Sequence, residues 1–290
     1  MEYTTLGRTG ATVSRIGFGG AALGLTNYLE TFDPHDAADR AKLFEGIDAA
    51  LDGGINYFDT AAAYGKGESE RVLGEGLKGV THSAGVPIVL STKVHPKQFA
   101  DNVRASLEGS LERLQRDRVD LLQIHGDTIT VADADRFLAP GGMAEQMLEL
   151  KAEGLVGNIG FSTEDNNDSV YRMIGSGLFD TVQLCYNFLF QHPYETSRPF
   201  GSMFEAEAQG MGILTMRAPT SGTFQRWIEM VNPANTFDYT PALIQFVLSN
   251  PLVDVALVGM RTAEIVRRNL EIADDLGGRL DIATVQERYV

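Results

Sequence analysis

The chain has 290 residues, of which 43% are hydrophobic and 22% charged, a balance typical of a large globular protein. Its formal net charge of −15 argues against nucleic acid as a partner, because phosphates are bound by clusters of Lys and Arg. No apolar run approaches the roughly 20 residues that cross a bilayer, so no membrane association is expected.

The only cysteine is Cys185, which cannot form an internal disulfide and lies in an apolar run where a buried, inert thiol is expected. The N-terminal residues lack the basic and then apolar pattern of a secretion signal. We therefore expect a cytoplasmic protein, as a monomer or a small homo-oligomer.

Short apolar runs typical of β-strands alternate with helical patterns along the chain. The runs cover residues 15–18, 55–59, 88–92, 119–125, 157–162, 181–184, 212–216 and 253–258. Between them, apolar residues recur at spacings of three and four, as in the stripe from Phe99 to Leu114. This alternation predicts an α/β fold, a single (β/α)8 TIM barrel of parallel strands, with residues 1–290 as one domain.

An open, doubly wound sheet is the alternative fold. It usually carries a Gly-x-Gly-x-x-Gly turn after its first strand, and Gly17, Gly19 and Gly20 do not have that spacing. Residues 5–14 predict a tight turn between two short strands, an N-terminal β-hairpin that would close the bottom of the barrel. Long loops at 126–142 and 217–239 follow the fourth and seventh strands, at the barrel face that usually carries the site.

Ionisable side chains stand at the ends of three consecutive predicted strands. These are Asp59, Lys93 and His125, and Tyr64 follows in the loop after Asp59. A barrel brings such strand ends together on one rim. The Lys93 ammonium would favour the phenolate and lower the pKa of Tyr64, while Asp59 would keep Lys93 charged and in place. With a histidine that donates to a carbonyl oxygen, the group offers a proton donor and an electrostatic hole for a developing alkoxide.

Each of these residues also has a simpler interpretation. Asp59 could cap the next helix, Tyr64 could anchor its loop, and Lys93 could be a surface charge. A histidine such as His125, at the end of an apolar run, is often a hydrogen-bonded core group. The joint arrangement is what favours a catalytic site.

The segment from Gly54 to Gly65, GINYFDTAAAYG, closely resembles the signature of the aldo-keto reductase family. The family pattern continues with Ser69-Glu70 and Leu73-Gly74, and Lys93 and His125 match its other two catalytic positions. The resemblance extends over nearly the whole chain. It implies that Tyr64 is the proton donor, that Lys93 tunes it, that Asp59 orients Lys93, and that His125 positions the substrate oxygen.

The resemblance also implies a nicotinamide cofactor held by the later strands. Ser162 and Gln183 match positions that bind the nicotinamide amide, whereas Thr163 replaces the family's asparagine. Arg217 stands where the family places an aromatic ring on the nicotinamide. Its planar guanidinium could stack in the same way, or it could bind the pyrophosphate or an acidic substrate.

The last strand resembles the family's clasp for the pyrophosphate and the adenosine 2′-phosphate. In this clasp a helix start supplies free N–H groups, and Arg261 could form a bidentate pair with the 2′-phosphate. Arg268 stands where the family often has a glutamate. The positive charge of Arg268 should favour NADP(H) over NAD(H) without excluding the latter. The remaining positions implied by the resemblance are Gly20, Ala21, Ala218, Gly222, Gly259, Thr262 and Asn269, and no metal is expected.

These features predict an NADP(H)-dependent oxidoreductase that reduces an aldehyde or ketone to an alcohol, or runs the reverse reaction, on a small-molecule substrate. Loop acids Asp127, Asp133 and Asp135 could bind hydroxyl groups and suggest sugars or polyols. A cofactor-binding regulatory subunit on the same fold, like the β subunits of potassium channels, is an alternative. An aldolase or isomerase with Lys93 as a Schiff base would need an uncharged amine, which Asp59 opposes.

Overall fold

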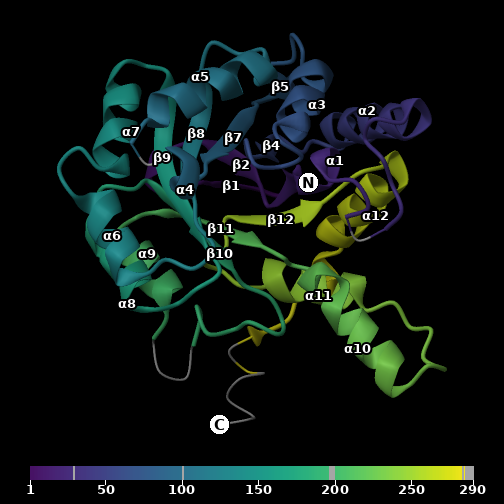
Figure 1. The fold of residues 1–290 in the computed structure, drawn as a ribbon. Coiled ribbons are helices and arrows are strands. Elements are labelled where there is room, and N and C mark those ends of the chain that lie inside the picture. The colour runs from purple at the N-terminus through teal and green to yellow at the C-terminus, as the bar shows by residue number, and fades with distance from the viewer. Residues whose placement is uncertain (29, 100, 196–199, 283, 285–290) are drawn as a thin grey trace.

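The fold is a closed barrel of parallel strands, as predicted (Figure 1). It is seen in a computed structural model that describes residues 1–28, 30–99, 101–195, 200–282 and 284. Around the barrel the strand order is β10-β11-β12-β3-β4-β7-β8-β9. The strands are β3 (Ile16–Gly19), β4 (Tyr57–Asp59), β7 (Val89–Val94), β8 (Val119–His125), β9 (Val156–Thr163), β10 (Thr181–Cys185), β11 (Gly212–Met216) and β12 (Val255–Gly259).

Helices surround the barrel, and α10 projects from it at the lower right of Figure 1. They are α1 (Ala21–Gly24), α2 (Ala37–Asp52), α3 (Glu68–Gly76), α4 (Pro96–Phe99), α5 (Val103–Leu114), α6 (Val131–Leu138), α7 (Met143–Ala152), α8 (Asp168–Gly175), α9 (Ser202–Ala208), α10 (Thr223–Val231), α11 (Thr240–Leu248) and α12 (Ala263–Asp274). Their apolar faces pack on the outward side chains of the strands to form the main core.

Local signals explain where the helices differ from the sequence pattern. The stripe from Phe99 to Leu114 is split between α4 and α5, because the side chain of Asn102 accepts a hydrogen bond from Ala105 N and starts a new helix. The predicted long loops at 126–142 and 217–239 each contain a helix. In the first of them, Thr130 and the acid three residues later form a capping box that begins α6.

The N-terminal hairpin is confirmed. Its strands β1 (Tyr3–Thr5) and β2 (Thr12–Ser14) pair antiparallel, and they are joined by a 3-10 turn. Leu6 and Val13 of this hairpin are buried in a separate apolar cluster with inward side chains of the barrel strands, such as Leu121 and Leu214. The hairpin therefore plugs the barrel at the start of its strands. A second short hairpin, β5 (His82–Ser83) with β6 (Val86–Pro87), was not predicted.

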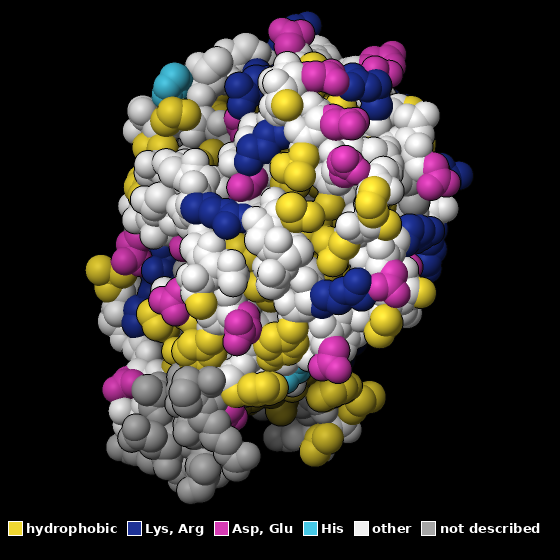
Figure 2. Space-filling model, turned by 90° about the vertical axis from the view of Figure 1, so that its left-hand side faces the viewer, with side chains coloured by type: hydrophobic (Ala, Val, Ile, Leu, Met, Phe, Trp, Pro, Cys, Tyr) yellow, Lys and Arg dark blue, Asp and Glu magenta, His cyan; other side chains and the backbone are white. Residues whose placement is uncertain are grey.

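The surface carries charges of both signs. On the face shown in Figure 2, basic side chains are scattered among acidic ones, and they form no continuous basic surface there. Within the described ranges, no helix combines the length and the apolar character needed to cross a membrane.

Candidate active site at the barrel rim

The strand ends bring Asp59, Tyr64, Lys93 and His125 together. Lys93 Nζ forms an ion pair with Asp59 and donates a hydrogen bond of 2.9 Å to Thr60 O. This pair is buried, with 1% of Lys93 and 3% of Asp59 exposed. Lys93 Nζ lies 5.4 Å from the centre of the Tyr64 ring, and the rings of Tyr64 and His125 meet edge to face with centres 5.3 Å apart. The predicted cluster is therefore a contiguous group.

The electrostatics differ from the expectation at one residue. Burial pulls the pKa of Lys93 down, but Asp59 and Tyr64 pull it up by more, so the ammonium stays charged. Burial raises the pKa of Tyr64 above its ordinary value, although Lys93 acts in the opposite direction. The prediction of a lowered pKa for Tyr64 is therefore wrong in this environment, because desolvation of the phenolate outweighs the nearby positive charge. Tyr64 keeps its proton and can donate it.

His125 is held neutral. Burial, then the charge of Lys93 and the neighbouring His95, lowers the pKa of His125 to about 3. Nδ1 of His125 is buried with no hydrogen-bond partner among the described residues. A neutral imidazole carries one N–H, and a buried N–H without an acceptor is costly. The proton is therefore better placed on Nε2, which leaves His125 able to donate into the cavity that it lines.

A cavity of about 370 Å³ opens above this cluster. Asp59, Tyr64 and His125 line it. Of the predicted cofactor positions, it is also lined by Gly20, Ala21, Ser162, Gln183, Arg217 and Gly259. The predicted residues that do not line it are Thr163, Ala218, Gly222, Arg261, Thr262, Arg268 and Asn269.

Thr163 is turned into the structure of its own loop. Its hydroxyl donates to Asp127 O at 3.1 Å and accepts from Asp165 N at 3.0 Å. Both bonding directions of the hydroxyl are used within the loop, so Thr163 does not replace the family's asparagine at the cavity. Ala218 is fully buried, and Gly222 precedes α10 with a φ of 72°. These two residues shape the loop after β11.

Arg217 forms an ion pair with Glu164, which also lines the cavity. Its backbone has a φ of 62°, and Thr220 and Ser221 in the same loop have φ values of 55° and 50°. Non-glycine residues rarely adopt this left-handed conformation, and such residues tend to cluster at functional sites. Glu164 was missed by the sequence analysis, which considered only the arginine.

Arg261 does not present a free guanidinium to a ligand in this structure. Only 3% of Arg261 is exposed. Its nitrogens donate to Ala22 O at 3.2 Å, to Glu30 Oε1 at 2.8 Å and to Tyr28 O at 2.9 Å, and its guanidinium lies 4.3 Å from the centre of the Phe32 ring. The expectation of an open bidentate site is therefore corrected: α1 and the segment after it occupy these donors, and Glu30 stands where an anion would bind.

Three further residues of the predicted clasp lie on α12 or at its N-cap. Arg268 forms an ion pair with Asp238, so its charge is already paired. Thr262 caps the helix, with its hydroxyl accepting from Ile265 N at 3.4 Å. Asn269 is buried, and its Nδ2 has no hydrogen-bond partner among the described residues. Asn269 is thus the member of this set with a donor to spare.

A second cavity of about 280 Å³ adjoins the first and shares His95, His125, Gly126 and Asp127 with it. Asp133 lines the second cavity, but its carboxylate belongs to the capping box of α6 and pairs with a neighbouring arginine. Asp135 pairs with Arg172 and lines neither cavity. Of the three loop acids considered for hydroxyl binding, Asp127 is therefore best placed.

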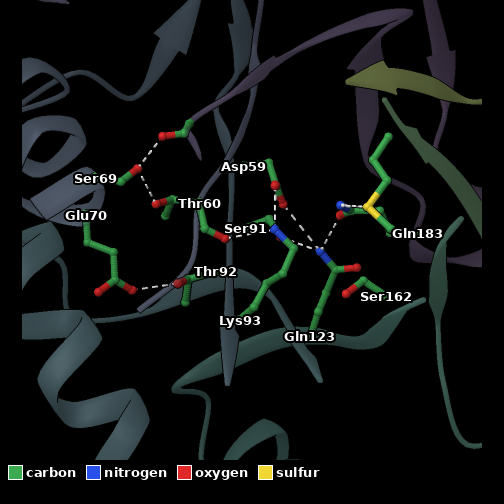
Figure 3. A network of polar contacts seen from close by, with 12 residues as sticks. Asp59, Thr60, Ser69, Glu70, Ser91, Thr92, Lys93, Gln123, Ser162 and Gln183 are labelled. Carbon is green, nitrogen blue, oxygen red and sulfur yellow. Dashed lines mark hydrogen bonds and ion pairs between the residues drawn. The ribbon is translucent and has the colours of Figure 1, made fainter. Parts of the chain in front are cut away.

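Gln123 was also missed by the sequence analysis. It lies on β8 two residues before His125, so both side chains are on the same face of the strand. Its Nε2 is 3.0 Å from Ser91 Oγ, 3.0 Å from Gln183 Oε1 and 3.4 Å from Asp59 Oδ1 (Figure 3). Alternation along β8 could have identified it as an inward polar residue.

A protonated tyrosine next to a buried lysine–aspartate pair, with a neutral histidine on the same barrel rim, defines an oxidoreductase that acts on carbonyl or alcohol groups. Comparison with known proteins gives the family. The model of the aldo/keto reductase family matches residues 15–286. The chain belongs to the aldo/keto reductase family.

Individual relatives agree with this assignment. The aldo-keto reductase YhdN of Bacillus subtilis is 30% identical, over 90% of this chain and 85% of the relative. The L-galactose dehydrogenase of Arabidopsis thaliana is 29% identical, over 95% and 89%. An aldo/keto reductase from Klebsiella pneumoniae, solved in complex with NADP and acetate, has the same fold with a TM-score of 0.71 at 23% identity, over 100% of this chain and 96% of that one.

Proposed function

We propose that this chain is an NADP(H)-dependent oxidoreductase that interconverts a carbonyl compound and its alcohol. The observation that carries the proposal is the buried Asp59–Lys93 ion pair beside Tyr64, with His125 at the same cavity. These groups supply what carbonyl reduction needs besides the hydride: a proton donor and stabilisation of negative charge on oxygen.

The four side chains have distinct roles in this proposal. His125 donates a hydrogen bond from Nε2 to the substrate oxygen and holds it near Tyr64. Tyr64 then gives its phenolic proton to that oxygen, and the ammonium of Lys93 stabilises the phenolate that remains. Asp59 keeps Lys93 charged and oriented. In the direction of alcohol oxidation the same proton returns to Tyr64.

Several residues fit a nicotinamide dinucleotide, which when bound supplies or accepts the hydride. Ser162 and Gln183 offer polar atoms to a carboxamide at the cavity wall. Gly259 has open space where a side chain would stand, so the backbone there can approach a pyrophosphate. The unpartnered Nδ2 of Asn269 can donate to an adenine. The Klebsiella relative, solved with NADP, supports the choice of cofactor, and NAD(H) is the alternative.

The preference for NADP(H) depends on Arg261. Binding of a 2′-phosphate to Arg261 requires that the phosphate displace Glu30, since the carboxylate already uses the same guanidinium. Arg268 is paired with Asp238 and would contribute a 2′-phosphate contact only after a similar exchange. In this proposal the 2′-phosphate of the cofactor replaces the Glu30 carboxylate as the anion bound to Arg261.

We propose a hydroxylated carbonyl compound, such as a sugar or polyol derivative, as the substrate class. The second cavity extends from His125 and has polar side chains along its wall, including Asp127 and Lys97. Such groups bind hydroxyls rather than an apolar tail. The similarity to an L-galactose dehydrogenase supports the same class.

The remaining proposals concern the protein as a whole. We propose that residues 1–290 act as a single domain in the cytoplasm, as a monomer or small homo-oligomer with no nucleic acid partner. The buried free thiol of Cys185 and the net charge of −15 support these choices.

The variant Tyr64→Phe tests the proposed function. It removes the proton and leaves the ring, so kcat for aldehyde reduction, followed by NADPH absorbance, should fall by a factor of about 10²–10⁴. The NADPH dissociation constant, measured by titration calorimetry, should hardly change. Full turnover by the variant would contradict the proposal.

A further inference from the structure

Gln123 connects the proposed catalytic pair to the proposed nicotinamide site. Gln123 is fully buried inside the barrel, and its amide group lies between Asp59 and Gln183 (Figure 3). Among the described residues, no hydrogen bond joins Asp59 to Gln183 directly, and Gln123 connects them.

The charge of Asp59 determines which end of the Gln123 amide faces it. An ionised carboxylate only accepts hydrogen bonds, so the amide must turn its NH2 group toward Asp59 and Ser91. In the opposite orientation the carbonyl oxygen of Gln123 would face the carboxylate, with no hydrogen between two oxygens. The cost of this second arrangement is high because the site is buried.

The orientation of Gln123 in turn determines that of Gln183. The NH2 group of Gln123 is 3.0 Å from Gln183 Oε1, and two NH2 groups facing each other would leave both donors without an acceptor. On its other side, the one acceptor for Gln183 Nε2 among the described residues is the sulfur of Met216 at 3.6 Å, which is a weak acceptor. Without Gln123, the amide of Gln183 could turn over at little cost.

We propose that Gln123 is a positioning residue that transmits the charge of Asp59 to the amide of Gln183, so that Gln183 meets the cofactor carboxamide in one fixed orientation. This inference rests on the proposed function, because it assigns Gln183 to the nicotinamide. The oxygen of Gln123 has no partner in the described residues, which fits a side chain kept for its donors.

A double-mutant cycle on NADPH affinity tests the inference. Gln123→Met keeps the length of the side chain and removes the amide, and it should weaken NADPH binding about three- to tenfold, the range of one lost hydrogen bond. Gln183→Met should weaken binding at least as much. If Gln123 acts through Gln183, the double variant should bind NADPH no more weakly than Gln183→Met alone. Calorimetric titration measures all four proteins, and thermal unfolding checks that each is folded.

The variant Gln123→Glu gives a second measurement that a purely structural role would not affect. An ionised glutamate offers Gln183 no donor and repels Asp59, whereas a protonated glutamate restores an O–H donor. NADPH affinity of Gln123→Glu should therefore improve as the pH falls, relative to that of Gln123→Met at the same pH.

The outcomes separate the two proposals. Additive losses in the double variant, or parallel pH dependence in the Glu and Met variants, would overturn the role of Gln123 while leaving the proposed function intact. Failure of the unsubstituted protein to bind NADPH would refute the cofactor assignment and the inference with it.

Discussion

The neutral state of His125 makes the stability of the protein depend on pH in a way that can be calculated. The unfolded imidazole binds a proton below its usual pKa of 6.5, whereas burial keeps the folded His125 neutral down to a pKa of about 3. The unfolded state therefore binds more protons between these values. The contribution to stability is complete above pH 6.5 and is lost as the pH falls toward 3.

Each pH unit below 6.5 costs about 1.4 kcal/mol of unfolding free energy for such a group. At about pH 5, the protein should have lost about 2 kcal/mol through His125 alone. The variant His125→Asn lacks the titrating group. Its free energy of unfolding should thus fall by about 2 kcal/mol less than that of the unsubstituted protein between about pH 7.5 and about pH 5.

Urea denaturation of both proteins at the two pH values measures this difference, and the other titrating groups largely cancel in it. His82→Asn is the matched control, because His82 is exposed on β5 and lines neither cavity, so this substitution removes a histidine outside the site. That control should keep the pH dependence of the unsubstituted protein. An equal loss of stability in His125→Asn and the unsubstituted protein would refute the assignment of a strongly lowered pKa to His125.

Three further predictions concern the cavity wall and the core. Arg217→Tyr removes a cation and leaves the Glu164 carboxylate at the cavity wall without its partner, so the affinity for NADP⁺ should rise relative to that for NADPH. An unchanged affinity ratio in calorimetric titrations would show that this charge does not act on the nicotinamide. Glu30→Gln removes the competitor for Arg261 and should tighten NADPH binding about three- to tenfold while leaving NADH unchanged, and equal effects on both cofactors would contradict the anion exchange. Burial raises the pKa of the Cys185 thiol to about 11, so the folded protein at about pH 8 should resist a thiol reagent that labels the unfolded chain, and prompt labelling of the folded protein would contradict this.

The barrel could be predicted from the sequence because each strand carries its own local pattern. Strands β8 and β11 have the predicted bounds, and the others differ by one or two residues at their ends. The rim cluster followed from the same pattern, since Asp59, Lys93 and His125 each stand at or next to a strand end. The fold determines where the carboxyl ends of the parallel strands meet. A correct prediction of the fold therefore also predicts that these side chains lie close together.

The parts that could not be predicted depend on contacts between distant segments. Arg261 is covered by Glu30, more than 200 positions earlier in the chain, and Arg217 pairs with Glu164 at the cavity wall. A local pattern identifies a cation but not the anion that will reach it. The pKa of Tyr64 was misjudged for a related reason: the sequence shows the neighbouring lysine but not the depth of burial.

The pairing of β3 with β12 has a consequence for synthesis of the chain. These strands are separated by more than 230 residues. One edge of β3, the first strand of the barrel, therefore stays unpaired until β12, the last strand, has been synthesised. Until then β3 and β11 remain open edges with exposed ladder groups, which favour aggregation. The N-terminal hairpin also cannot complete its packing before the last strand is made, because Leu6 and Val13 share an apolar cluster with Val255 and Leu257. A ribosome-bound chain that ends before Val255 should therefore depend on chaperones, and release of the last strand should trigger closure of the barrel.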